Sequence, residues 1–340
     1  MRAENRSRGL CSCLQDTSQD CFLDKFIDRQ SRALSNLSLD GLLPNQTQIA
    51  SFVTGSQIMH ALLPLTRLIL SAICFFAVFN AKAASPIRLF NGVDLSGWTS
   101  WLRESQHEDP NKVFTVSEAS IRISGEGYGY LATLNEFENY RLSLEFRWGD
   151  QAATDRRDRK GKALDSGVFL HASGPHGNSH DGDGAYMAAI ECNVYQGATG
   201  DVLLIRGDDP QGKLIVPRAS VAQAAILDAD GFPFWSPGGR SRSLHTFGRI
   251  NWLHKSPQWQ DQRDFRGKHD LEKPYGEWNR LQCECRNRTI TIRLNGTRIN
   301  QVSQVYPHKG KVLLQCEGAE IFFRKILLTP IDSEKNSNEE

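Results

Sequence analysis

One carboxylate stands in the middle of an apolar, strand-like segment, "AIECNVY", at residues 189–195. Successive side chains of a β-strand point to opposite faces, so the pattern puts three polar side chains on one face: Glu191, Asn193 and Tyr195. A glutamate in that position is either a solvated residue of a sheet or the working acid or base of a site. The segment alone leaves both interpretations open.

Three further polar residues stand near predicted strands and could join Glu191. Asp165 and His171 lie at the two ends of the strand-like segment "DSGVFLH", and Asp201 follows the Glu191 strand in "ATGD". Imidazoles exchange protons near neutral pH, and carboxylates serve in general acid–base chemistry. Each residue also has a structural alternative, because such aspartates are typical of turns and a histidine at a strand end is often a surface or hydrogen-bonding residue.

The loop "HASGPHGNSHDGDG" gathers imidazoles and carboxylates that could hold a divalent cation. These residues are His171, His176, His180, Asp181 and Asp183. Their spacing matches neither a calcium-binding loop nor an H-E-x-x-H zinc site, and the composition is equally typical of an exposed loop. The sequence therefore assigns no cofactor and no metal ligand, and a divalent cation stays an open alternative.

The elements that would position these residues are short β-strands. Apolar and polar residues alternate with period 2 in most segments after about residue 86, separated by Gly, Asn and Asp turns. The clearest segments are "YRLSLEFRW" (140–148), "TITIRLNGTRIN" (289–300) with an Asn-Gly hairpin turn, and "GKVLLQCEGAEIFFRKILLTP" (310–330), which contains two strands. The pattern favours an all-β fold, a sandwich or jelly roll of two antiparallel sheets.

One region lacks this period-2 alternation. From about residue 206 to residue 277 the chain is irregular and rich in proline and aromatic residues. Long loops without regular structure are usually functional or disordered, and this one is too aromatic to be disordered. We expect an ordered loop region that packs over one end or one face of the sandwich.

The N-terminal quarter of the chain has the pattern of a targeting segment. The run "LILSAICFFAVF" (68–79) is uncharged and mostly apolar, and an A-x-A cleavage signal that ends at Ala83 follows it. A run of this length fits the core of a secretory signal better than a membrane span. We expect translation to start at Met59; a long signal region and a signal anchor are the alternatives. The predicted layout is an untranslated or disordered extension at 1–58, a signal peptide at 59–83 and a single domain at 84–340.

Charge and composition narrow the classes of function. The chain has 340 residues, a formal net charge of +1 and 23% charged residues, which is ordinary for a globular protein. It has neither a basic stripe with interleaved aromatic residues nor zinc-finger spacing, so no nucleic-acid partner is expected. Signal cleavage would export the domain to the periplasm or the extracellular medium, without a stable membrane span.

Four cysteines fall in the predicted domain: Cys192, Cys283, Cys285 and Cys316. Cys283 and Cys285 share a face of one predicted strand, so either could pair with Cys316 in an oxidising compartment. A zinc site is a weaker alternative, because no fourth ligand is evident. Buried unpaired thiols fit the pattern as well as a disulfide does.

Several sequence segments of the chain together resemble one family. They are "IRLFNGVDLSGWTSW", "KALDSGVFLH", "AAIECNVYQGATGDVLLI", "GEWNRLQCECRNRTITIRLNG" and "GKVLLQCEGAEIFFRKILLTP". Their order and completeness over residues 86–331 resemble the 3-keto-disaccharide hydrolase domain, formerly a domain of unknown function in secreted proteins of Planctomycetes and Bacteroidetes. The resemblance implies a concanavalin-like jelly-roll sandwich whose concave face holds a small carbohydrate substrate, a glucoside already oxidised to a ketone at carbon 3.

The implied substrate changes what the Glu191 strand must supply. Ordinary glycosidases need two carboxylates, and laminarinase-like enzymes of this fold carry them at positions i and i+4, where this chain has Tyr195. In a 3-keto sugar, one base can remove the acidic hydrogen on carbon 2, the enolate expels the group on carbon 1, and water adds to the double bond. We predict Glu191 as the base and His171 as its acid–base partner, with an arginine or a divalent cation holding the enolate.

The remaining predicted site residues would bind the sugar. They are Asn193, Tyr195, Asp165, Arg147, Trp101, Trp148 and Asp201. Aromatic rings offer broad apolar faces to a sugar, and arginine can contact sugar hydroxyls or an enolate. The family's strand motif usually reads Glu-x-Gln, whereas this chain has Glu191-Cys192-Asn193, whose amide has a shorter reach. A non-catalytic carbohydrate-binding module and a conventional two-carboxylate glycoside hydrolase are the alternatives.

Overall fold

The structure, a computed structural model, describes most of the predicted domain. The predicted extension at 1–58 and the predicted signal peptide at 59–83 lie outside the described residues. No described segment forms an apolar helix long enough to cross a membrane. The described residues are 85–149, 159–180, 182–245 and 248–332.

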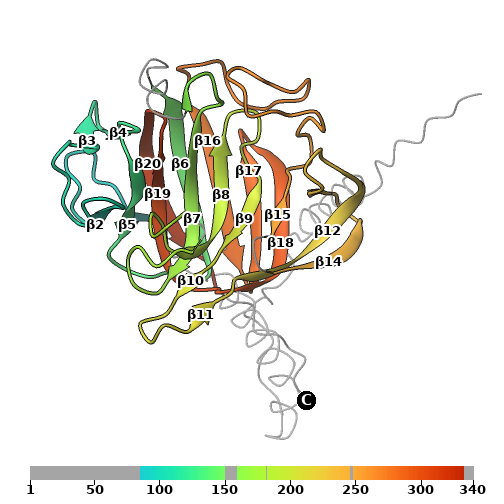
Figure 1. Cartoon of the computed structure of the whole chain (residues 1–340), viewed down its shortest axis with the longest axis horizontal. Coiled ribbons are helices and arrows are strands. Elements are labelled where there is room, and N and C mark those ends of the chain that lie inside the picture. Colours follow the sequence, from blue (N-terminus) through green and yellow to red (C-terminus); the bar gives the residue numbers. More distant parts are fainter. Residues whose placement is uncertain (1–84, 150–158, 181, 246–247, 333–340) are drawn as a thin grey trace, which may run out of the picture. The chain divides into compact units, whose positions relative to one another are not determined.

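The described part of the chain is built from strands, most of which form two large antiparallel sheets (Figure 1). The eleven-stranded sheet contains β1 (Ile87–Arg88), β3 (Phe114–Ser117), β4 (Ser120–Ile123), β6 (Tyr140–Trp148), β12 (Arg218–Leu227), β13 (Pro233–Trp235), β14 (Arg240–His245), β16 (Asn279–Arg286), β17 (Thr289–Leu294), β18 (Thr297–Tyr306) and β20 (Ile321–Pro330). The seven-stranded sheet contains β2 (Trp98–Leu102), β5 (Tyr128–Thr133), β7 (Asp165–Ser173), β8 (Ala188–Tyr195), β9 (Val202–Ile205), β15 (Arg249–Ile250) and β19 (Lys311–Glu317). A small third sheet pairs β10 (Gly207–Asp208) with β11 (Leu214–Ile215).

The strand order brings distant segments of the chain together. The seven-stranded sheet has the order β15-β9-β8-β7-β19-β5-β2, so β7 pairs with β19 although strands β8 to β18 separate them in sequence. The eleven-stranded sheet has the order β13-β12-β18-β17-β16-β6-β20-β4-β3, with β1 on β20 and β14 on β12. This non-local pairing decides which side chains meet at the candidate site.

The apolar faces of the two sheets pack against each other and form the core. Leu144 on β6 belongs to the same buried cluster as Ile190, Cys192 and Val194 on β8, and Figure 1 shows β7, β8 and β9 in front of the strands of the other sheet. Removing these side chains from water is the main driving force for the fold. The predicted all-β sandwich is confirmed, and so is the predicted facing of the Glu191 strand.

The hairpin and the C-terminal strand pair predicted from the sequence are both present. β17 and β18 are joined at Asn295-Gly296, whose φ angles are 50° and 91°. A two-residue hairpin turn of this type requires positive φ at both positions, which explains the Asn-Gly sequence. β19 ends at Glu317 and β20 begins at Ile321, as the break in the sequence pattern indicated.

The region from 206 to 277 is more regular in its first part than the sequence indicated. It holds β10 to β15, and β12 continues the eleven-stranded sheet by pairing with β18. β12 is hard to recognise in the sequence because only Ala219 and Val221 of its ten residues are buried. The segment 251–278 contains no strand and is the irregular part of this region.

A buried glutamate anchors the irregular segment to the sandwich. Glu272 accepts hydrogen bonds from Trp148 Nε1 at 3.2 Å, from Thr199 Oγ1 at 2.8 Å and from the Gly197 backbone N–H at 3.1 Å. Burial raises the pKa of Glu272 to about 7, and the nearby negative charge of Asp270 acts in the same direction. The three donors fix the segment, and the raised pKa makes this anchor sensitive to pH.

All four cysteines of the described residues are free and buried. Cys283 and Cys285 lie on β16 in one sheet, whereas Cys316 lies on β19 in the other. All four thiols belong to the core cluster. The structure therefore shows buried unpaired thiols rather than the alternative disulfide to Cys316.

Glu272→Gln is expected to remove a pH dependence of stability. The pKa of Glu272 is about 7 in the folded chain, above the ordinary value of 4.5, so the folded state binds this proton more tightly than the unfolded state. The resulting stabilisation is complete below pH 4.5, and about 3 kcal/mol is lost as pH rises through 7. Urea unfolding of the wild-type protein and of Glu272→Gln from pH 4.5 to 8 measures the difference in their free energies of unfolding at each pH. Glu108→Gln removes an exposed carboxylate, and its difference from the wild-type protein should not change with pH.

Candidate functional site

A cavity of about 340 Å³ lies on the seven-stranded sheet, on the face turned away from the core. Its polar lining comes from β7, β8, β15 and β19, which are neighbours or near neighbours in that sheet. The polar side chains are those of Asp165, Glu191, Asn193, Tyr195, Arg249, Gln315 and Glu317, together with Tyr186 from the segment just before β8. Because alternation sends the apolar residues of β8 into the core, the polar residues of the same strand must face this cavity.

Glu191 is a buried carboxyl group with no hydrogen-bond partner among the described residues. It is 4% exposed, and no described residue donates a hydrogen bond to it. Burial raises its pKa well above the usual range, the negative charge of Glu317 raises the pKa further, and the Arg249 guanidinium opposes the shift. Such a group accepts and holds a proton more readily than an exposed glutamate does.

Two further carboxyl groups line the same cavity. Burial raises the pKa of Asp165 well above its usual range, with Glu317 adding to the shift and Arg159, whose guanidinium lies 3.4 Å away, opposing it. Glu317 accepts a hydrogen bond from the side-chain amide of Gln315. Because neighbouring negative charges repel each other, ionisation of one of these carboxyl groups disfavours ionisation of the others.

Gly167 makes room for the polar groups of the cavity. A methyl group at this position would lie 2.5 Å from Glu191 Oε1 and 2.6 Å from Gln315 Oε1, closer than van der Waals contact permits. The carboxyl group from β8 and the amide from β19 therefore both lie over the bare backbone of β7 between them. A glycine is needed here for close approach, and its φ is not positive.

Two amide oxygens in the lining have no hydrogen-bond donor among the described residues. They are Asn193 Oδ1 and Gln315 Oε1, and both residues are at most 5% exposed. Buried polar atoms are nearly always paired, so orphaned acceptors in a cavity are available to a ligand with hydroxyl groups. The shorter arm of Asn193 still reaches the cavity lining.

A buried ion network fixes Arg249 beside the cavity. Asp201 is fully buried and accepts hydrogen bonds from Arg249 Nη2 at 2.6 Å, from Lys255 Nζ at 2.8 Å and from the Trp252 backbone N–H at 2.8 Å. Asp201 does not line the cavity, although we predicted it to bind substrate. Its position makes it a residue that orients Arg249.

Comparison with known proteins identifies the family of the domain. The chain matches the family of the 3-keto-alpha-glucoside-1,2-lyase-like domain over residues 85–329. The chain belongs to this family. No curated protein matches the chain.

Solved structures of similar fold have low sequence identity to the chain. A protein of Parabacteroides distasonis, provisionally described as a glycosyl hydrolase, is 14% identical, with 74% of this chain and 96% of that chain covered and a TM-score of 0.41. A carbohydrate-binding module from Bacillus subtilis is 8% identical (68% and 95% covered, TM-score 0.36). The Bacillus licheniformis β-glucanase is 6% identical (74% and 100% covered, TM-score 0.35). The function of this family member is argued from its own site.

Tyr195 faces the cavity, as predicted. Its hydroxyl accepts a hydrogen bond from Arg159 Nη2 at 3.3 Å, and its ring meets the ring of Trp259 edge-on at 4.8 Å. Arg159 also pairs with Asp165, so one guanidinium links two residues of the lining. No local sequence pattern indicates that Arg159 and Trp259 take part in this arrangement.

His171 does not join Glu191, so the predicted acid–base pair is wrong in this family member. The pairing of β7 with β8 shifts register between Leu170 and Ser173, and His171 has a φ of 57°. This bulge turns the imidazole to the opposite face, where its ring lies 5.7 Å from that of Tyr140 and its Nδ1 lies 3.2 Å from the Pro307 carbonyl oxygen. Burial lowers the pKa of His171 to about 4.

Three predicted sugar-binding residues do not line the cavity. Arg147 and Trp148 lie on β6 in the other sheet, where the Arg147 guanidinium stacks over Phe322 at 4.3 Å and Trp148 is in the core. Trp101 on β2 donates a hydrogen bond to the Gly184 carbonyl at 3.0 Å and packs against the loop that follows β7. Their aromatic and cationic character serves packing at these positions.

The histidine-rich loop forms separate pairs. His180 contacts Asp208 at 2.7 Å and His176 contacts the Tyr130 hydroxyl at 2.9 Å, while Asp181 lies outside the described residues. Among the residues with described positions, no group of three or more His, Cys, Asp or Glu side chains is arranged to hold a metal ion. The loop therefore offers no assembled ligand set in its described part.

Sequence reasoning missed Gln315, Glu317 and Arg249. The first two alternate with apolar residues in "LLQCEG", in the same polar–Cys–polar arrangement as the Glu191 strand. That pattern places both side chains on one face of β19, which is the available signal. Arg249 comes from a two-residue strand, β15, and no local pattern identifies it.

Gly167→Ala is expected to reduce activity on the family's substrate class by about 100-fold while leaving a folded protein. The added methyl group displaces the Glu191 carboxyl group and the Gln315 amide, whose flexible ends can move, and a misplaced catalytic group costs a factor of this size. Circular dichroism and steady-state kinetics measure the two effects. Gly296→Ala strains a positive-φ hairpin turn outside the cavity lining and is the control for a backbone cost without a displaced side chain; full activity of Gly167→Ala would contradict the packing argument.

Proposed function

We propose that the domain cleaves 3-keto-glycosides by elimination across carbons 2 and 1, followed by hydration. The observation that carries the proposal is the Glu191 carboxyl group, which is 4% exposed, faces a cavity and accepts no hydrogen bond from the described residues. A buried ionisable group without a partner is costly and marks a functional site. Membership of the 3-keto-alpha-glucoside-1,2-lyase-like family supports the substrate class.

Glu191 is the base of the proposed reaction. It removes the proton on carbon 2, which the ketone at carbon 3 acidifies, and the electron pair moves onto the ketone oxygen to give an enolate. The raised pKa of Glu191 strengthens it as a base. Arg249, oriented by Asp201, lines the same cavity and stabilises the developing negative charge.

Asp165 is the proton donor of the proposed reaction. Its raised pKa favours the protonated carboxyl group, which can give a proton to the departing glycosidic oxygen as the bond to carbon 1 breaks. Water then adds to the double bond: its hydroxyl goes to carbon 1, its proton to Asp165, and Glu191 returns a proton to carbon 2. Both carboxyl groups regain their starting states, and the net reaction is hydrolysis.

The size and lining of the cavity fit a small carbohydrate. Its volume of about 340 Å³ is at the lower end of the range for small-molecule sites, roughly 300 to 1,000 Å³. Asn193 Oδ1 and Gln315 Oε1 are acceptors for sugar hydroxyls. The cavity offers one sugar ring several polar contacts on the face of a rigid sheet.

Glu191→Gln is expected to lower kcat on a 3-keto-glucoside by at least about 100-fold, because the amide cannot accept the proton from carbon 2. Aglycone release measures the rate, and the 2-hydroxy-3-keto-glucal that accumulates when hydration is slow identifies elimination. Glu108→Gln, an exposed glutamate elsewhere in the chain, is the matched control. Near wild-type turnover of Glu191→Gln would remove Glu191 from the mechanism.

The same assay separates the alternatives. Equal rates on unmodified and 3-keto disaccharides would indicate a conventional glycoside hydrolase, and sugar binding without turnover would indicate a binding module. The substitution Asn193, in place of the family's usual glutamine, is the feature that favours a binding module. Assays with and without chelator test whether a divalent cation assists the arginine.

We also propose export to the periplasm or the extracellular medium. The apolar run at 68–79 and the cleavage signal that ends at Ala83 support this proposal. Expression of the full chain with its own N-terminal region should yield an exported protein whose first residue is Ala84, read by N-terminal sequencing. Retention of the uncleaved chain in the cytoplasm would contradict it.

A further inference from the structure

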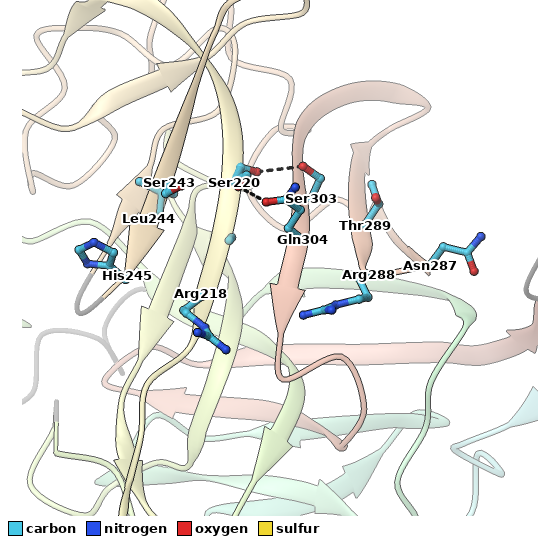
Figure 2. Close-up of a pocket in the computed structure, with 11 residues that line it drawn as sticks. Arg218, Ser220, Ser243, Leu244, His245, Asn287, Arg288, Thr289, Ser303 and Gln304 are labelled. Carbon is cyan, nitrogen blue, oxygen red and sulfur yellow. Dashed lines mark hydrogen bonds between the residues drawn. The ribbon is translucent and has the colours of Figure 1, made fainter. Parts of the chain in front are cut away.

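A second and larger cavity lies on the eleven-stranded sheet (Figure 2). Its volume is about 790 Å³, and it is bordered by β12 and β14 on one side and by β17 and β18 on the other. Ser220 and Ser303 line it, whereas their neighbours Val221 and Val302 belong to the core. The cavity is therefore on the outer face of this sheet, with the core between it and the Glu191 cavity.

The lining of this second cavity carries positive charge without a carboxylate. Arg218 comes from β12 and Arg288 from the turn between β16 and β17, and Figure 2 shows their side chains extending toward each other. Neither guanidinium forms an ion pair with a carboxylate among the described residues. Unpaired guanidinium groups present several N–H donors in a fork that suits carboxylate or sulfate oxygens.

Contacts on both arginines hold them in place. Arg288 Nε donates to the Val305 carbonyl at 3.2 Å, which leaves its terminal N–H groups for another acceptor. The Arg218 guanidinium lies over the Tyr306 ring at 5.0 Å, and Tyr306 is 40% exposed. Because these contacts already restrict both side chains, binding an anion costs less side-chain conformational entropy.

Hydroxyl and amide groups make up most of the remaining lining. They belong to Ser220, Ser243, Asn287, Thr289, Ser303 and Gln304. Ser220 Oγ donates to Gln304 Oε1 at 2.9 Å, and Gln304 has a φ of 52° where the pairing of β12 with β18 shifts register. A bulge of this kind redirects a side chain, here into a surface rich in donors and acceptors for hydroxyl groups.

An adjoining cavity of about 300 Å³ shares Asn287, Arg288 and Thr289 with the cavity between Arg218 and Arg288. His171 lines this adjoining cavity, and its Nε2 is buried without a hydrogen-bond partner among the described residues. The His171 side chain is 1% exposed and sits on the positive-φ bulge of β7. A buried imidazole with one unsatisfied nitrogen, on a strained backbone, is a second observation that points to a ligand at this end of the sheet.

We infer that the cavity between Arg218 and Arg288 binds an acidic oligosaccharide, with its carboxylate or sulfate groups on the guanidiniums and its hydroxyls on the serine, threonine and amide side chains. A free small anion would leave most of the 790 Å³ unused. Single-stranded nucleic acid would need aromatic rings for its bases to stack on, and the lining contains none besides the histidine. The inference does not depend on the proposed function.

Isothermal titration of the purified chain with two acidic probes tests the inference. The probes are hexagalacturonate and a chondroitin sulfate hexasaccharide, with cellohexaose as the neutral comparison. Arg218→Gln and Arg288→Gln should each weaken binding of an acidic probe by about tenfold, the loss expected for a charge-assisted contact. Arg293→Gln removes the same charge from an exposed position on β17 outside the cavity and should change affinity less than twofold.

Each other outcome overturns the inference. These outcomes are no binding of either acidic probe, equal binding by the arginine variants, equal affinity for cellohexaose, equal affinity for inorganic sulfate, and tighter binding of a hexanucleotide. Glu191→Gln should bind the acidic probes unchanged; if it loses them, the probes occupy the Glu191 cavity, and the inference fails while the proposed function stands. Circular dichroism of the arginine variants separates lost contacts from lost folding.

Discussion

The buried negative charge of Asp201 is the constraint on which the candidate site depends. A charge with no access to water must be compensated within the protein, and Asp201 achieves this through Arg249, Lys255 and the Trp252 backbone N–H. These three partners come from β15 and the segment after it, so one carboxylate ties that segment to the start of β9. The same contacts aim the Arg249 guanidinium at the cavity that contains Glu191.

Burial also gives the cavity its chemistry. Glu191 and Asp165 have raised pKa values chiefly because neighbouring elements cover them. Gly167 allows this covering without a clash, since β7 offers bare backbone where the side chains from β8 and β19 converge. Burial, strand order and one glycine therefore act together to keep these carboxyl groups away from water, and this burial raises their pKa values.

The strands could be predicted from the sequence because their signal is local. Period-2 alternation located β6, β8, β17 and the β19–β20 pair, and it gave the facing of Glu191, since side-chain direction follows directly from alternation. His171 could not be placed, because a single-residue bulge reverses its direction and leaves no mark on the alternation of "SGVFLH". Glu317 and Arg249 reach the site through the order of strands in the sheet, which depends on tertiary packing.

The Glu191 cavity and the cavity between Arg218 and Arg288 lie on opposite faces of the sandwich. Because the core separates them, a long acidic chain held at Arg218 and Arg288 would leave the Glu191 cavity open to a small glycoside. Holding the domain on a polymer that also carries or traps a small glycoside would raise the effective concentration of that glycoside without any change in the Glu191 cavity. Binding and cleavage would then be separable, since each cavity has its own charged residues and shares no lining residue with the other.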